Sequence, residues 1–97
     1  MAVAIIQDWI EPETDRSTVN YDAVSDRLMA QGEPIDGLLV HSAGYTGSGF
    51  RIYEIWESRA HFDRFLSDRL MPLLMAQEGN PTPPTLTEYE LHNVIVP

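Results

Sequence analysis

The strongest constraint on the fold is the order in which two kinds of apolar pattern alternate along the chain. Segments rich in β-branched and aromatic residues predict strands, and apolar residues that recur every three or four positions predict helices. The patterns predict strands over 2–10, 37–43, 50–57 and 85–96, and helices with apolar stripes between residues 21 and 29 and between residues 62 and 74. We therefore expect one βαββαβ domain over residues 1–97.

Capping and helix-breaking residues mark the ends of the two predicted helices. Ser17 or Asn20 can cap the first helix, and Gly32 is placed to end it. Ser58 can cap the second helix, and Pro72 is expected to kink or restart it near its end, because proline lacks the amide proton that a helix interior needs.

Each helix has an apolar stripe that must be buried, which favours a ferredoxin-like α+β plait: a four-stranded antiparallel sheet with two helices on one face. The other face would be polar in a simple monomer, yet neighbouring strand positions are apolar on both faces, as in Ile5 with Ile6, Leu39 with Val40, Ile52 with Ile55, and Val94 with Ile95. A second copy of the chain is the simplest cover, so we predict a homodimer that forms a dimeric α+β barrel. The alternative is a monomer whose strands are simply hydrophobic at their centres.

Charge and composition exclude several function classes. The formal net charge is −9, all six cations are scattered arginines, and no lysine or cysteine occurs. This argues against nucleic acid and anionic membranes as partners. It also excludes disulfides, thiolate metal sites, thiol nucleophiles, Schiff bases and P-loops. The short apolar start has no preceding cation and cannot span a bilayer, so we expect a cytoplasmic protein.

Histidines are the first candidates for a general base, because their pKa ordinarily lies near neutrality. His41 lies in an otherwise apolar strand and must either find a partner or line a pocket. It ranks first, although a hydrogen-bonded structural histidine explains it as well. His92 ranks second. His61, in the first turn of the second helix, is expected at the surface.

Alternation along the third strand gives two different polar sets. Arg51 and Tyr53 share one face and could stabilise an anion, whereas Glu54 and Trp56 share the other. Pairing with a carboxylate explains Arg51 better than a catalytic role does, and packing in the core likewise explains Trp56 better.

The first strand adds two further candidates. Asp8 could act as a base or orient a histidine, and we expect Trp9 to line the substrate site together with Trp56 and Glu54.

Neither a metal nor a cofactor is expected. His41 and His92 with Asp8 or Glu54 would supply the two histidines and one carboxylate of a metal site. No local ligand spacing in the sequence supports such a site. The glycines of the 44–49 segment join two strands rather than opening a helix, so a turn explains them better than phosphate binding.

Three segments together resemble a known superfamily: Gly37-Leu-Leu-Val-His-Ser-Ala-Gly44, Gly49-Phe-Arg-Ile-Tyr-Glu-Ile-Trp-Glu-Ser58, and the helix from Phe62 to Pro72. They are similar to the dimeric α+β barrel superfamily, and Trp56-Glu-Ser before a helix is typical of its antibiotic-biosynthesis-monooxygenase-like members. The resemblance implies face-to-face dimers with a pocket in each subunit. Members include cofactor-free monooxygenases, haem-degrading enzymes, muconolactone isomerases and polyketide cyclases.

The haem-degrading branch fits this sequence poorly. The resemblance would place that branch's second tryptophan at Phe65, its haem-ligating histidine at Met75 and its first-strand asparagine near Ile6 or Gln7, and none of these residues is of the required type.

Two functions remain open. The first is a cofactor-independent enzyme acting on a small hydrophobic aromatic or polyketide-like molecule, as a monooxygenase or a cyclase or isomerase. In it, His41 or His92 removes a proton, and Tyr53 or Arg51 stabilises the oxyanion. The alternative is a non-catalytic homodimer that binds a small ligand or has a structural or stress-response role.

Overall fold

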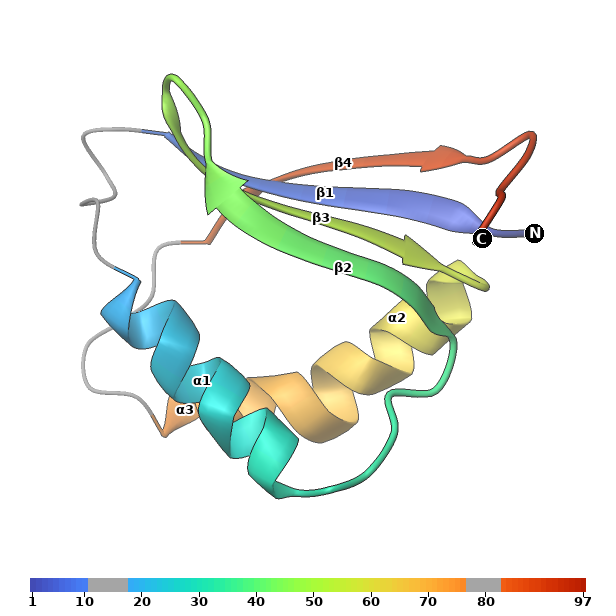
Figure 1. Cartoon of the computed structure of the whole chain (residues 1–97). Coiled ribbons are helices and arrows are strands. Elements are labelled where there is room, and N and C mark those ends of the chain that lie inside the picture. Colours follow the sequence, from blue (N-terminus) through green and yellow to red (C-terminus); the bar gives the residue numbers. More distant parts are fainter. Residues whose placement is uncertain (11–17, 77–82) are drawn as a thin grey trace.

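The computed structural model describes residues 1–10, 18–76 and 83–97, and the elements follow the predicted order. They are β1 (Val3–Ile10), α1 (Val19–Ala30), β2 (Leu38–Tyr45), β3 (Gly49–Trp56), α2 (Arg59–Phe65), η1 (Leu66–Leu70), α3 (Met71–Met75) and β4 (Thr85–Glu90). The strands form one antiparallel sheet in the order β2-β3-β1-β4. Figure 1 shows the helices together on one side of this sheet. The predicted α+β plait is confirmed.

The register of the two central strands decides which side chains face the helices. Ile5 pairs with Glu54, and Asp8 pairs with Arg51. Because side chains alternate along a strand, Ile5, Glu54 and Trp56 lie on the helix face, whereas Asp8 and Arg51 lie on the opposite face. We call this opposite face, which no described helix covers, the open face of the sheet.

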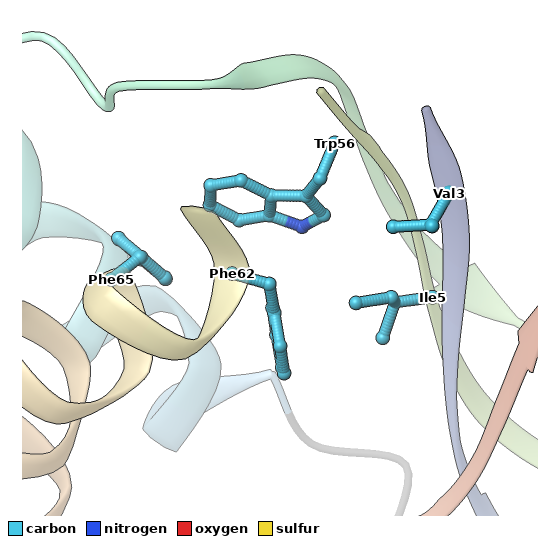
Figure 2. Packing of buried hydrophobic residues seen from close by; sticks show 5 residues of the cluster. All are labelled: Val3, Ile5, Trp56, Phe62 and Phe65. Carbon is cyan, nitrogen blue, oxygen red and sulfur yellow. The ribbon is translucent and has the colours of Figure 1, made fainter. Parts of the chain in front are cut away.

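The hydrophobic core lies between the helix face and α2. Figure 2 shows Trp56 between the side chains of Phe62 and Phe65 from α2 and those of Val3 and Ile5 from β1. Trp56 is completely buried, and the ring centroids of Phe62 and Phe65 lie 5.7 and 5.2 Å from that of Trp56. The core therefore joins the end of β3 to α2.

The second helix begins and restarts where the sequence predicts. The Ser58 hydroxyl accepts a hydrogen bond from the amide of His61, which caps α2. The following turn, η1, is a π-helix in which the amide of Met71 donates to the carbonyl of Leu66. Pro72 then stands in the first turn of α3, where the missing amide proton costs little. The wider π turn lets the helix continue past the proline.

The first helix differs from its prediction at the start. Ser17 lies outside the described residues, and Asn20 is already in the first turn, because the carbonyl of Thr18 accepts the first helical hydrogen bond from the amide of Asp22. Gly32 follows the helix with φ of +69°, as expected of a helix-ending glycine. None of the helices in the described ranges is long and apolar enough to cross a membrane.

The prediction of a last strand over 85–96 is wrong beyond residue 90. β4 ends at Glu90, which pairs with Val3 at the start of β1, and one more backbone bond joins Leu91 to Ala2. Past that point β1 offers no further partner. Val94 and Ile95 therefore lie outside the sheet, and they give no information about its two faces.

Gly37 and Gly32 offer a matched test of packing at the helix–sheet connections. Both have positive φ, but a Cβ atom at Gly37 would lie 2.4 Å from the His61 ring, whereas one at Gly32 would meet nothing. We expect Gly32→Ala to lower the free energy of unfolding by about 1 kcal/mol through backbone strain alone. Gly37→Ala should cost about 2–4 kcal/mol, because overpacking is added to the strain. Urea denaturation checks this difference, and equal costs would contradict it.

Candidate functional site

Strand pairing places a histidine directly opposite a buried carboxylate. His41 of β2 pairs with Glu54 of β3, and both side chains lie on the helix face. Glu54 is only 5% exposed, and it is the one buried charged residue among those described. A buried carboxylate is stable only when donors satisfy it, so its partners define the site.

Glu54 is held by two donors, and His41 links it to α1. His41 Nδ1 lies 2.6 Å from Glu54 Oε2, and the Trp56 indole Nε1–H donates to Glu54 Oε1 over 3.3 Å. On the other side of the imidazole, Nε2 lies 2.6 Å from the Tyr21 hydroxyl. We call this chain of contacts between Tyr21, His41, Glu54 and Trp56 the Tyr–His–Glu network.

The donors and acceptors of the network place its protons. A carboxylate only accepts, so Nδ1 of His41 carries a proton toward Glu54. Burial first, and then the negative charges of Glu54 and Asp22, raise the pKa of Tyr21 above its ordinary value. The Tyr21 phenol therefore keeps its proton at neutral pH and can donate it to Nε2 whenever Nε2 carries none. Nε2 is the basic atom, and it faces α1.

Aromatic rings extend the helix face beside this network. The ring centroid of Phe50 lies 5.6 Å from that of Tyr21, 5.2 Å from that of Tyr45 and 6.2 Å from that of Trp9. The ring planes are inclined to one another by 52 to 74°, so the rings form an apolar aromatic patch rather than one flat surface. Trp9 is thus on the same face as His41, as a substrate-lining role requires.

Arg51 and Tyr53 lie on the open face and cannot join His41 within one chain. Arg51 makes a bidentate ion pair with Asp8, with distances of 2.7 and 3.1 Å. Tyr53 is hydrogen-bonded to Tyr89, which raises the pKa of Tyr53. The predicted combination of a His41 base with an oxyanion held by Arg51 or Tyr53 is therefore corrected, because the sheet separates the two sets. Asp8 is paired with Arg51 and orients no histidine.

The other histidines are not brought to the site. His92 follows β4 and is exposed, and β4 and β2 are the opposite edges of the sheet, so His92 and His41 do not converge. His61 is partly buried, with Nδ1 2.7 Å from the Ser58 hydroxyl. Within the described ranges, no three His, Asp or Glu side chains are grouped as metal ligands.

Trp56 is part of both the core and the network, since its ring is fully buried while its N–H bonds Glu54. Tyr21 is the residue that sequence reasoning missed. Because Tyr21 belongs to the apolar stripe of the first helix, the sequence suggested only that it packs. The one signal that could have identified it is its hydroxyl, a polar group on an otherwise apolar stripe.

A shallow hollow of about 250 Å³ lies elsewhere, between α2 with η1 and the 33–36 segment. Two of the arginines that line it bind neighbouring groups: Arg64 lies 3.7 Å from Asp36, and Arg69 donates to the carbonyls of Glu33 and Pro34. The hollow includes none of the Tyr–His–Glu network, so we do not assign the site there.

Comparison with known proteins identifies the fold. No family model matches the chain, and no curated protein matches its sequence. Among solved structures, Rv0793 from Mycobacterium tuberculosis is similar with a TM-score of 0.69 and 19% identity, over 99% of this chain and 100% of that one. A point mutant of SnoaB, a cofactor-independent oxygenase from Streptomyces nogalater, has a TM-score of 0.66 and 13% identity, over 97% and 96% of the two chains. These likenesses confirm the α+β plait that the sequence predicted.

A haem-degrading protein shares the fold as well. MhuD from Mycobacterium tuberculosis, solved with two haems in its active site, matches with a TM-score of 0.57 and 16% identity, over 99% of this chain and 100% of that one. Two of the positions at which the sequence analysis compared this chain with haem-degrading proteins are Phe65 and Met75. Phe65 packs against Trp56 in the core, and Met75 is 79% exposed at the end of α3.

Exchange of Glu54 for glutamine tests how the network places its protons. The Trp56 N–H can only donate, so the amide oxygen of the introduced glutamine should accept from Trp56, and its NH₂ group should donate to His41 Nδ1. In E54Q the proton of His41 should therefore move from Nδ1 to Nε2. The ¹⁵N shifts of the imidazole report this change of tautomer directly.

The matched control is Glu88→Gln, because Glu88 lies on β4 and accepts from Arg59 rather than from a histidine. We expect E88Q to leave the imidazole shifts unchanged. A His41 tautomer that is the same in E54Q as in the unsubstituted protein would show that Glu54 does not set it.

Proposed function

With the fold of the dimeric α+β barrel superfamily as the premise, we propose that this chain is an enzyme that removes a proton from a small hydrophobic molecule of the aromatic or polyketide type. The observation that carries the proposal is the 2.6 Å contact between His41 Nδ1 and the buried Glu54 carboxylate. A carboxylate at one nitrogen fixes the tautomer and stabilises the imidazolium that forms when the other nitrogen takes a proton. His41 Nε2 is the base, and Glu54 positions it.

Tyr21 is the donor best placed to stabilise the anion. Its hydroxyl is already at Nε2, and its raised pKa keeps it protonated. When the substrate loses its proton to Nε2, the phenol can donate to the oxygen on which negative charge develops. Tyr21 thus takes the role that the sequence suggested for Tyr53 or Arg51.

The charges of the site favour a substrate that is neutral before it reacts. Glu54 is a buried anion, and none of the described arginines is bonded to Tyr21, His41 or Glu54. An anionic substrate would meet repulsion without a compensating cation. A neutral phenol, enol or β-diketone would not, and the rings of Phe50 and Trp9 provide apolar surface for it to pack against.

Proton removal is the first step of both proposed reactions. In a cofactor-independent monooxygenase the carbanion reacts with dioxygen, whereas in a cyclase or isomerase it closes a ring or shifts a double bond. The second candidate function, a ligand-binding or structural homodimer without catalysis, is favoured by one observation: both nitrogens of His41 have partners within the chain.

We also propose that a second copy of the chain covers the open face. This face is largely apolar, and the side chains at its centre are Ala4, Ile6, Val40, Tyr53, Ile55 and Tyr89. Its charges, Asp8 and Arg51, are already paired, so two copies can meet there despite a net charge of −9 on each chain. A face of this kind is typical of an interface with a second subunit.

Turnover by His41→Gln tests the proposed base. A panel of phenols and β-diketones is incubated with and without oxygen, and substrate loss and product are followed by mass spectrometry. We expect H41Q to lower turnover about 10²–10⁴-fold, since this is the usual contribution of a positioned general base. Oxygen dependence separates the monooxygenase from the cyclase or isomerase.

His61→Gln is the control, because it makes the same change in a histidine outside the network, and turnover should be retained. Full activity of H41Q, or loss of activity in His92→Gln alone, would contradict the assignment. A protein that binds members of the panel without converting any would support the non-catalytic alternative.

Sedimentation velocity tests the homodimer. We expect the unsubstituted protein to sediment as a dimer and Ile6→Arg to sediment as a monomer, because the arginine would bury an unpaired charge at the centre of the interface. Met29→Arg is the control, since Met29 is 71% exposed on α1, away from the open face. Circular dichroism confirms that both variants are folded, and a dimeric I6R protein would contradict the proposed interface.

A further inference from the structure

Helix α1 is attached to the rest of the molecule more weakly than α2. It has no buried residue, and Val19 and Met29 are each 71% exposed. Figure 1 shows it beside α3, which is its main packing partner, whereas α2 contributes Phe62 and Phe65 to the core. Segments with few buried apolar contacts open at a lower free energy than the core.

The two ends of α1 are held by different polar contacts. At the C-terminal end, the Arg69 guanidinium from η1 donates to Gln31 Oε1 over 3.0 and 3.2 Å, and to the carbonyls of Pro34 and Glu33 over 2.8 and 3.2 Å. At the N-terminal end, Tyr21 reaches the sheet through its hydrogen bond to His41 and its ring contact with Phe50.

The contact at the N-terminal end occupies the atom that a ligand needs. Nδ1 of His41 is committed to Glu54, so Nε2 is the remaining position on the imidazole, and the Tyr21 hydroxyl fills it. A ligand cannot bond Nε2 until this hydroxyl leaves.

We propose that Tyr21 is an internal competitor for His41 Nε2, and that a hydroxyl-bearing ligand binds by displacing it together with the first turn of α1, while Arg69 holds the last turn. The phenol returns to the ligand oxygen only when that oxygen gains negative charge, so it competes with binding and stabilises the anion at different steps. The inference rests on one part of the proposed function, namely that His41 Nε2 is the atom that faces the ligand. Tyr21 then determines specificity: a ligand hydroxyl restores the hydrogen bond that is broken, whereas a molecule without one leaves Nε2 unpaired.

The group that a ligand displaces is an uncharged phenol. Burial and the neighbouring carboxylates raise the pKa of Tyr21, so the phenol is uncharged when it leaves and no charge has to be moved. A neutral ligand hydroxyl can therefore replace it at Nε2 without a change in the ionisation of the network.

Tyr21→Phe tests the competition, with 2-naphthol as the probe and isothermal calorimetry as the measurement. The substitution keeps the ring on Phe50 and removes the hydroxyl that competes for Nε2. We expect 2-naphthol to bind about 2- to 10-fold more tightly to Y21F, which is the range of one net hydrogen bond. The gain should vanish when Y21F is combined with H41Q. Tyr89→Phe, on the open face, is the matched control and should leave the affinity unchanged.

Hydrogen exchange provides the second readout. In the unsubstituted protein, 2-naphthol should speed amide exchange in the first turn of α1, around Tyr21, and leave the last turn, around Leu28, unchanged. Equal or weaker binding of 2-naphthol to Y21F would overturn the proposal, and so would faster exchange along the whole of α1.

The affinity and hydrogen-exchange measurements do not require turnover, so they test the competition by Tyr21 separately from the proposed enzymatic activity. If H41Q abolishes turnover while Y21F leaves the affinity unchanged, the proposed function stands and the competition by Tyr21 is refuted. If Y21F binds more tightly but no compound is converted, the competition stands and the enzymatic proposal fails.

Discussion

The burial of the Glu54 carboxylate is the constraint on which the site depends. An ion in the protein interior is stable only when hydrogen-bond donors replace the water it has lost. Trp56 and His41 supply those donors, one from the centre of the core and one from the neighbouring strand. The Trp56 ring packs between α2 and β1, and its N–H bonds Glu54, so the packing of the core also positions Glu54. Glu54 in turn orients His41.

The two faces of the sheet have different chemistry although they share the same strands. On the helix face, aromatic rings and one buried acid surround a histidine. On the open face, an exposed ion pair between Asp8 and Arg51 adds little stability, as such pairs usually do, but it leaves the face without net charge. The first arrangement suits proton transfer, and the second suits contact with another subunit.

The two main helices, α1 and α2, are attached to the rest of the molecule in different ways. α2 is fixed by its Ser58 cap and by two buried phenylalanines, and the π turn carries the helix past Pro72 into α3. α1 is held near its C-terminal end by Arg69, and Tyr21 near its N-terminal end contacts the sheet through His41 and Phe50. The stable part of the layer builds the core, and the weakly held part covers the basic nitrogen.

Sequence periodicity determined the element order, the Ser58 cap, the restart at Pro72, and the separation of Glu54 and Trp56 from Arg51 and Tyr53. These features depend on neighbours within a few residues, so local patterns suffice to predict them. Strand partners depend on register, and therefore only the tertiary structure showed that β4 ends at Glu90, where β1 offers no further partner. The same reason applies to the site: His41 meets Glu54 across a strand pair and Tyr21 across a helix–sheet connection, and packing, not periodicity, brings such distant residues together.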